Sequence, residues 1–396
     1  MSIKNNSRHT IFACYDGYIT QAIVNNFAPL LFLIFRDRFG LPLEQITLLV
    51  TINFLVQLAV DLVAAKVADR IGWRRCLVAA HIFAAAGLAG LSLFPNIMPP
   101  FAGLLTSVVL YAVGGGLIEV LVSPVVEACP TENKAGVMSL LHSFYCWGTV
   151  GVVALSTLFL SVFGKDSWQI LALCWAVFPL LVSVYFTQVP IYSLTEEGES
   201  YGIRQLCGMK SFWLFVVLMF AAGASEQAMS QWASAFAESG LGISKTIGDL
   251  LGPCLFSVLM GSSRVFYGKM SEKINLNSFL ILSGVLCIGS YLLASLSPFP
   301  ILSLVGCGLC GLSVGILWPG VFSLAAAEIP KGGTAMFALL ALAGDLGCSG
   351  GPTTVGMLTG LFDGELKPAL LFGIVFPMIM IVGALIQRKD SKNRLK

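Results

Sequence analysis

Charged residues are scarce in this sequence. Lysine, arginine, aspartate and glutamate make up 11% of the 396 residues, whereas globular domains usually carry about 25%. The mean hydropathy is correspondingly high at +0.86, so we interpret the chain as an integral membrane protein, with the lipid bilayer as its surroundings. There is no basic domain, and the net charge is only +2. We therefore expect no nucleic-acid partner.

The sequence also lacks the motifs of nucleotide-driven or enzymatic chemistry. Glycines gather at 114–116, 306–315 and 347–351, but no strand precedes them and no Gly-Lys-Ser/Thr follows, which argues against a phosphate-binding loop. No nucleophile with its base, and no pair of aspartates at matching depth, is spaced for an intramembrane protease. The 11 cysteines are scattered through apolar runs, as small core residues. We predict that the protein is not an enzyme and holds no cofactor or metal.

Long apolar runs are abundant, and most have the length of about 20 residues that crosses a bilayer as a helix. The first run is longer than the core of a signal peptide, so we expect it to stay as the first span. The predicted class is all-α integral membrane, with twelve transmembrane helices in two six-helix halves. The expected spans are 11–35, 44–65, 76–94, 100–128, 135–163, 168–188, 211–237, 246–267, 276–296, 299–327, 333–361 and 366–387.

The distribution of positive charge predicts the orientation of these spans. Most lysines and arginines fall in the two tails and in the even-numbered loops. By the positive-inside rule these segments lie on the cytoplasmic side. We therefore expect a multi-pass protein of the cell (inner) membrane with both termini in the cytoplasm.

The sequence contains an internal repeat, in which its second half resembles its first. Aligning Pro130 with Pro330 places the helix at 137–151 over the helix at 336–350. The longest connection, 189–210, is polar and lies where a parallel repeat would need a join. The predicted division is an N-terminal half of residues 1–188, a cytoplasmic linker of residues 189–210 and a C-terminal half of residues 211–396.

The connection after the second span carries a motif. It reads DLVAAKVADRIGWRRC over residues 61–76 and resembles the cytoplasmic signature loop of the major facilitator superfamily, Gly-x-x-x-Asp-Arg-x-Gly followed by basic residues. Ala65 replaces the first glycine, and Trp73 interrupts the basic run. The resemblance implies the major facilitator fold and a cytoplasmic gate, although the basic residues could also serve topology alone. With the matching residues of the second half, the gate residues are Asp69, Arg70, Gly72, Arg74, Arg75, Glu272 and Lys273.

Shorter motifs resemble one branch of that superfamily, the fucose–galactose–glucose:proton symporters. These are GLIEVLVSP at 116–124, GPTTVG at 351–356 and the spacing of Glu226 from Trp232. The resemblance implies proton-coupled sugar transport, with an acid in the fourth span. This chain departs from the branch at Ser123, where asparagine is usual. It also departs at Asn25–Asn26, where the branch has an acidic residue after asparagine.

Three buried titratable residues are candidates for proton coupling. Glu119 lies in mid-helix, and a carboxylate at that depth is costly in hydrocarbon unless it faces water or the protein interior. It either binds and releases a proton or forms structural hydrogen bonds. Asp345 offers a second ion site or a partner for Arg264, and His142 is either a proton relay or a structural residue. The predicted proton-coupling residues are Glu119, Asp345 and His142.

A second set of residues could bind the substrate. Glu226 has polar neighbours, and a hydroxyl-rich ligand needs several convergent donors and acceptors, although such a patch can also serve helix packing. Asn25 and Asn26 bond either substrate hydroxyls or neighbouring helices. Aromatic rings can stack on a sugar, and Trp318–Pro319 interrupts the tenth span at the repeat position of Glu119. The predicted substrate-binding residues are Asn25, Asn26, Ser123, Tyr145, Glu226, Gln227, Trp232 and Trp318.

We expect a secondary active transporter that imports a sugar or related small polar metabolite with a proton, by alternating access. The coupling ion is a proton or a sodium ion, and we expect a monomer. Two alternatives within transport stay open: proton-coupled efflux of amphipathic, drug-like compounds, and an uncoupled facilitator. The fold does not decide between them. A sensor would usually need an attached signalling domain, and the residues after Gln387 form only a short basic run.

Overall fold

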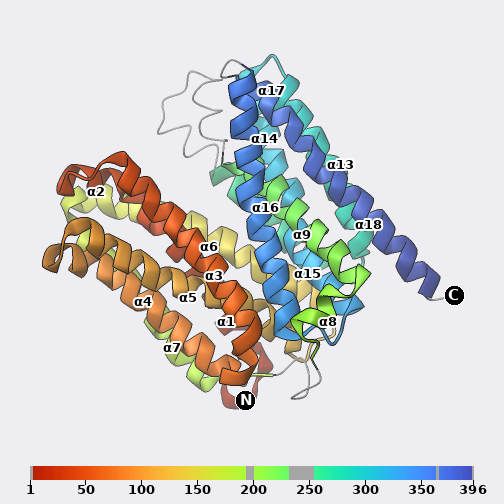
Figure 1. Ribbon diagram of the computed structural model, residues 1–396, viewed down its shortest axis with the longest axis horizontal. Helices are drawn as coiled ribbons and strands as arrows, with labels where there is room; N and C mark the ends of the chain where they lie inside the picture. Colours follow the sequence, from red (N-terminus) through yellow and green to blue (C-terminus); the bar gives the residue numbers. More distant parts are fainter. Residues whose placement is uncertain (1–2, 193–199, 232–253, 363–364, 395–396) are drawn as a thin grey trace. The chain divides into compact units, whose positions relative to one another are not determined.

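The computed structural model describes residues 3–192, 200–231, 254–362 and 365–394. All regular elements among these residues are helices (Figure 1). The helices before residue 190 are η1 (Ile3–Asn5), α1 (Ser7–Leu30), α2 (Phe32–Phe39), α3 (Leu43–Ile71), α4 (Trp73–Ile97), α5 (Pro100–Ala128), α6 (Lys134–Phe163), η2 (Lys165–Ser167) and α7 (Trp168–Gln188). Those after residue 200 are α8 (Ile203–Cys207), α9 (Lys210–Ser230), α12 (Leu255–Met270), α13 (Leu276–Leu296), α14 (Pro300–Val314), α15 (Leu317–Glu328), α16 (Gly333–Leu361), α17 (Leu366–Leu371), η4 (Phe372–Ile374) and α18 (Val375–Arg394).

The helices confirm the predicted all-α membrane class. Ten stretches of described helix are long and apolar enough to cross a membrane. The other two expected spans correspond to α1 with α2, and to α12, which is described from Leu255 onward. The last residues of the expected span 211–237 lie outside the described part of the chain.

Two of the expected spans divide close to a proline rather than running continuously. The span expected at 11–35 divides into α1 and α2 at Leu31, with Pro29 inside the last turn of α1. The tenth span divides into α14 and α15 at Gly315–Ile316, just before the predicted interruption at Trp318–Pro319. A proline has no N–H for the carbonyl four residues earlier, and its ring clashes with that carbonyl, so the helix opens there.

The described helices pack into two compact units. Unit 1 takes the described residues within 1–131, 144–200 and 333–338, and unit 2 takes those within 132–143, 201–332 and 339–396. The expected linker 189–210 contains α8. The division of the chain into halves at this linker stays a prediction.

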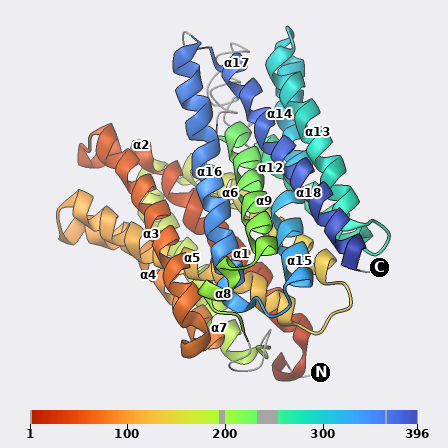
Figure 2. The same cartoon turned by 45° about the vertical axis from the view of Figure 1, so that its right-hand side comes forward.

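Three consecutive glycines on α5 organise unit 1. A Cβ atom on Gly114 would lie 2.6 Å from the backbone nitrogen of Ala84 on α4, and one on Gly115 would lie 2.9 Å from Oε1 of Gln21 on α1. A Cβ atom on Gly116 would lie 3.0 Å from the Cβ of Val60 on α3. Each glycine therefore lets a different helix approach α5 closely. The helices α3, α4 and α5 lie side by side (Figure 2).

A glycine face on α16 has the same role in unit 2. Gly347 lies against the carbonyl oxygen of Phe220 on α9, and a Cβ on Gly351 would lie 2.6 Å from the carbonyl oxygen of Ala224. Gly344 lies against the indole ring of Trp318 on α15. Both ribbon views place α9 beside α16 (Figures 1 and 2). Small residues of this kind let membrane helices approach closely.

We predict that Gly114→Ala destabilises the protein, because the added methyl group would overlap the backbone of α4. Overpacking of this kind costs about 1–3 kcal/mol. Gly151→Ala on α6 is the matched control, since nothing lies within 4 Å of its added Cβ and alanine favours a helix over glycine by about 1 kcal/mol. Thermal unfolding of the purified variants measures both effects. Equal melting temperatures for Gly114→Ala and the wild type would contradict the close approach of α4.

Candidate functional site

A line of side-chain amides runs through unit 1 from α3 and α1 to α5. Gln21 donates from Nε2 to Oε2 of Glu119 at 3.0 Å and to Oε1 of Gln57 at 3.1 Å. Gln57 donates from Nε2 to Oδ1 of Asn25 at 2.9 Å and to Oδ1 of Asn53 at 3.0 Å. Asn53 adds a longer hydrogen bond of 3.4 Å from Nδ2 to Oδ1 of Asn25. We call these five residues the amide cluster.

Helical spacing brings the amide cluster together. Gln21 and Asn25 are four residues apart on α1, as are Asn53 and Gln57 on α3, so each pair shares one helix face. Gln21, Asn53 and Gln57 are buried, whereas Asn25 and Glu119 are half-buried. Burying a polar side chain costs free energy unless it forms hydrogen bonds. The mutual bonds of the amides are what allow α1 and α3 to present polar faces to α5.

Only two members of the amide cluster were predicted from the sequence, Glu119 and Asn25. The sequence does contain a signal for the others. Gln21, Asn53 and Gln57 interrupt apolar runs, where an uncompensated polar group is costly, and they recur at a helical spacing of four.

The remaining predicted residues of unit 1 take part in two other sets of hydrogen bonds. Asn26 donates from Nδ2 to the carbonyl oxygen of Ala22 at 2.9 Å and to Oγ1 of Thr149 at 3.3 Å. Thr149 donates in turn to the carbonyl oxygen of Tyr145 at 3.0 Å, which ties Asn26 to α6. The hydroxyl of Ser123 lies 3.1 Å from that of Tyr18 on α1. Asn26 and Ser123 therefore both bridge helices, and their substrate-binding roles stay predictions.

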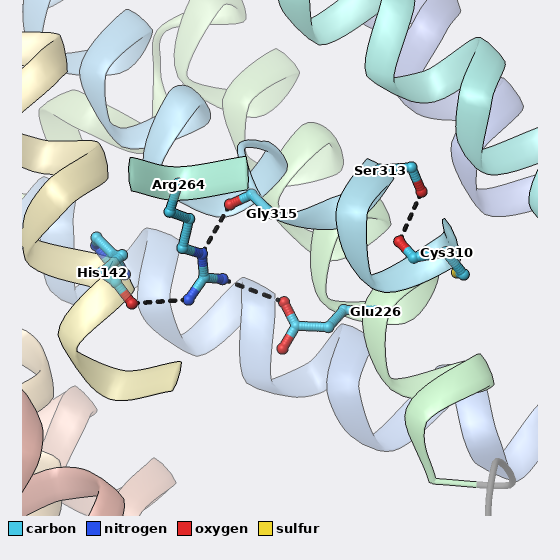
Figure 3. Close-up of polar contacts among 6 residues, drawn as sticks. All are labelled: His142, Glu226, Arg264, Cys310, Ser313 and Gly315. Atoms are coloured by element: carbon cyan, nitrogen blue, oxygen red, sulfur yellow. Dashed lines mark hydrogen bonds and ion pairs between the residues drawn. The ribbon is translucent and has the colours of Figure 1, made fainter. Parts of the chain in front are cut away.

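A buried arginine is the centre of the second polar cluster, in unit 2 (Figure 3). Arg264 on α12 donates from Nε to the carbonyl oxygen of Gly315 at 2.7 Å and from Nη1 to that of His142 at 2.9 Å. Its Nη2 lies 3.5 Å from Oε2 of Glu226 on α9, which completes an ion pair. The carbonyl oxygen of Arg264 accepts a hydrogen bond from the hydroxyl of Ser139 at 2.8 Å. We call Arg264, Glu226, His142 and Gly315 the arginine cluster.

The break between α14 and α15 explains one of these hydrogen bonds. Pro319 has no N–H, so the carbonyl of Gly315, four residues earlier, has no helical donor at that position. Arg264 supplies the missing donor from Nε. A guanidinium has five N–H donors in a fixed plane, and it can therefore satisfy carbonyl and carboxylate acceptors at the same time.

His142, Trp318, Asp345 and Gln227 also belong to unit 2. His142 takes part through its backbone carbonyl, and its ring lies 5.9 Å from that of Phe322. Trp318 is buried and meets the same phenyl ring edge-on at 6.2 Å. Asp345 on α16 and Gln227 on α9 are half-buried. Trp232 lies outside the described residues, so its role stays a prediction.

The predicted cytoplasmic gate forms a compact turn in unit 1. Oδ1 of Asp69 accepts hydrogen bonds from Nε1 of Trp73 at 2.8 Å and from Oγ1 of Thr334, at the start of α16, at 2.6 Å. Gly72 joins α3 to α4 with φ +95°, a conformation that favours glycine. Arg74 donates to the last carbonyls of α7 at 2.8 and 2.9 Å, where a cation also complements the helix dipole.

The other predicted gate residues are exposed. Arg70 lies in the last turn of α3 and Arg75 in the first turn of α4, both with exposed side chains. Glu272 and Lys273 lie in the turn after α12 and are also exposed. Among the described residues, no group of three or more histidines, cysteines or carboxylates could hold a metal ion.

Comparison with known proteins gives a family match over most of the chain. A model described as the Major Facilitator Superfamily matches residues 17–352. A curated relative, the membrane protein MosC of Rhizobium meliloti, is 23% identical over 309 residues, which cover 78% of this chain and 73% of that protein.

Solved structures with the same fold include several transporters. FucP in the outward conformation has a TM-score of 0.83 at 15% identity, covering 95% of this chain and 98% of its own, and FucP is the fucose:proton symporter of E. coli. The proton:xylose symporter XylE has a TM-score of 0.76 at 14% identity, covering 96% and 94%. The human organic anion transporter MFSD10 has a TM-score of 0.75 at 14% identity, covering 96% and 100%. At these identities the likeness shows the fold alone.

We predict that Arg264→Ala destabilises the protein by about 3–5 kcal/mol, because it removes a buried guanidinium from an ion pair and leaves a half-buried carboxylate without that partner. Glu226→Gln should cost less, since an amide oxygen can still accept from Nη2. The double variant should lose less than the sum of the two single changes, because it removes the unpaired charge as well. Thermal unfolding measures the three variants, with the exposed Arg8→Ala as control. Strictly additive losses would show that Arg264 and Glu226 do not interact energetically.

Proposed function

The chain belongs to the Major Facilitator Superfamily and is a multi-pass membrane transporter, and we propose that it moves a sugar or a related small polar metabolite together with a proton. The fold is that of the family, with its standard twelve-helix architecture. It is a transporter and not an enzyme. Substrate class and ion coupling are the proposed part.

The observation that carries this proposal is the amide cluster. It joins side-chain amides, which both donate and accept hydrogen bonds, to one carboxylate: Gln21 donates to Glu119, and Gln57 links Gln21 to Asn25 and Asn53. Sugar hydroxyls both donate and accept hydrogen bonds, so a sugar site requires such a mixed set. A site for amphipathic drugs would instead be mainly apolar. Asn25 is half-buried, which leaves part of its amide for a ligand.

Glu119 is the proposed proton site. It is the acid of the amide cluster, and one proton changes it from an acceptor into a group that also donates. For coupling, protonation must favour one of the two alternating states, or change the affinity for substrate in it. Asp345 and His142 are secondary candidates, and a sodium ion is the alternative to the proton.

The fold relatives indicate which substrates to test first. FucP and XylE are named as proton symporters of fucose and xylose, whereas MFSD10 is named as an organic anion transporter. We therefore propose monosaccharides as the leading class and include acidic sugars beside them. The proposed orientation has both termini in the cytoplasm, and the proposed state is a monomer.

We predict that Glu119→Gln abolishes sugar-driven proton movement and leaves sugar exchange intact, because glutamine keeps the hydrogen-bonding shape and loses the proton site. The assay uses proteoliposomes that contain a pH-sensitive dye. Each variant is challenged with L-fucose, D-xylose, D-glucose, D-galactose, glucosamine and glucuronic acid. Exchange of the same radiolabelled sugars is measured in parallel. Glu132→Gln, an exposed glutamate after α5, is the matched control and should behave as the wild type.

The result has three clear alternatives. Sugar exchange without any proton signal in the wild type would indicate an uncoupled facilitator. Displacement of a lipophilic dye with no response to any sugar would indicate efflux of amphipathic compounds. A proton signal that survives in Glu119→Gln would move the proton site to another residue, with Asp345 the next to replace.

A further inference from the structure

The hydrogen bonds of the amide cluster start at Gln21, which donates both toward Glu119 and toward Gln57. An ionised carboxylate only accepts, so the side of Gln21 that meets Glu119 must be its nitrogen. The same nitrogen donates its other hydrogen to Oε1 of Gln57. Gln57 then turns its own nitrogen to Asn25 and Asn53. Each amide is thereby oriented by the one before it, starting from Glu119.

All the hydrogen-bonding groups of the Gln57 side chain are used in this arrangement. Its two N–H groups meet the oxygens of Asn25 and Asn53, and its own oxygen accepts from Gln21. Since a primary amide has two hydrogens, no further donor is left. Gln57 is the only residue in the described part of the chain that bonds to both Gln21 and Asn25 through its side chain.

Asn25 is the half-buried end of the line. Its oxygen faces the cluster and accepts from Gln57 at 2.9 Å. Its Nδ2 makes no hydrogen bond to any residue that the structure describes. With Glu119 ionised, Asn25 therefore offers N–H donors to a ligand.

Gln21, which lies next to Glu119 in the line, has an unused acceptor. Oε1 of Gln21 is buried and has no hydrogen-bond partner among the described residues. It lies beside Gly115, where a Cβ would come within 2.9 Å of it. Leaving a buried acceptor unpaired costs about 1–3 kcal/mol, so Gln21 is held in this orientation by its two donated bonds alone.

We propose that the line Glu119–Gln21–Gln57–Asn25 reports the protonation state of Glu119 at Asn25, by reversing the direction of its hydrogen bonds. A proton that binds Oε2 of Glu119 turns it into a donor, and no other covalent bond changes. Gln21 then turns its oxygen toward both Glu119 and Gln57. Gln57 turns its oxygen toward Asn25, whose oxygen becomes the group offered to a ligand.

The reversal keeps these hydrogen bonds and exchanges donor and acceptor in each. It does so between Glu119 and Gln21, between Gln21 and Gln57, and between Gln57 and both asparagines. The longest hydrogen bond, 3.4 Å between Asn53 and Asn25, is exchanged in the same way. Each step rotates a neutral amide, so no charge crosses the helix interface. Gln57 is thus a positioning residue for coupling, on the premise of the proposed function that Glu119 is the proton site.

Other titratable groups lie on the helices packed against α5. They include Tyr18 on α1, Asp61 on α3 and His81 on α4, all buried. Tyr18 lies 3.1 Å from Ser123, and His81 bonds through Nδ1 to the carbonyl of Leu77 on its own helix. Asp61 lies one turn beyond Gln57 on α3, so Asp61→Asn is included to separate its protonation from that of Glu119.

The test is infrared difference spectroscopy of the whole protein in liposomes, between mildly alkaline and acidic buffer and without any sugar. Asparagine is labelled with carbon-13 at its side-chain carbonyl. The expected wild-type spectrum contains a protonated-carboxyl band that Glu119→Gln removes and Asp61→Asn retains. It also contains a shift of the asparagine carbonyl band. Gln57→Leu should keep the carboxyl band and lose at least about half of the asparagine shift.

Two further variants keep the test decisive. Asn25→Ala changes a half-buried residue and should lose the share of the asparagine shift that Asn25 contributes, even where Gln57→Leu folds poorly. Asn53→Ala removes the side branch with its own labelled carbonyl and should retain the share from Asn25. Gln169→Leu on α7, whose amide donates only to the carbonyl of Ser92 at 3.4 Å, is the matched control.

The failures of the two proposals are distinguishable. An asparagine shift that is undiminished in both Gln57→Leu and Asn25→Ala, or a carboxyl band without any asparagine shift, would overturn the relay and leave proton symport untouched. A carboxyl band that persists in Glu119→Gln would overturn both. Loss of the shift in Gln57→Leu with no response to any sugar in proteoliposomes would support the relay and reject the proposed substrate class.

Discussion

Close helix approach at three consecutive glycines is the constraint on which unit 1 depends. Gly114, Gly115 and Gly116 point toward α4, α1 and α3 in turn, because successive residues of a helix face directions about 100° apart. Glu119 follows within one turn. The carboxylate therefore lies where helices already converge, and Gln21 reaches it at 3.0 Å. Larger side chains in the triplet would move α1 and α3 outward and leave Glu119 without amide partners.

Unit 2 also brings buried polar groups together, but at a helix break and a buried arginine rather than at three consecutive glycines. Membrane helices must satisfy their backbone polar groups internally, and non-helical backbone is tolerated only where other groups supply the bonds. Pro319 removes one donor, and Arg264 replaces it at the carbonyl of Gly315. The ion pair with Glu226 then compensates the buried guanidinium. The same arginine therefore supplies a donor to the backbone at the helix break and pairs with a carboxylate on α9.

The fold could be predicted from the sequence because the length of an apolar run can be read directly from the order of its residues. The sequence predicted the site less completely, because depth along a helix is visible in a sequence and rotation about the helix axis is not. Glu119 stood out as an acid in mid-membrane, and Asn25 through its departure from the symporter pattern. Gln21 and Gln57 were overlooked, although their bonds define the cluster. Pro29 was equally visible, yet the break it causes in the first span was not predicted.

The proposed relay would also account for a departure from the symporter branch. That branch is expected to have a second acid after asparagine in the first span, and this chain has Asn25–Asn26 there. Two ionisable groups can be coupled by their charges, but each is costly to hold within the membrane. Amides carry no net charge, and turning one exchanges donor for acceptor without moving charge through a low-dielectric interior. In the proposed relay, one acid on α5 with amides on α1 and α3 would make ligand binding depend on a proton.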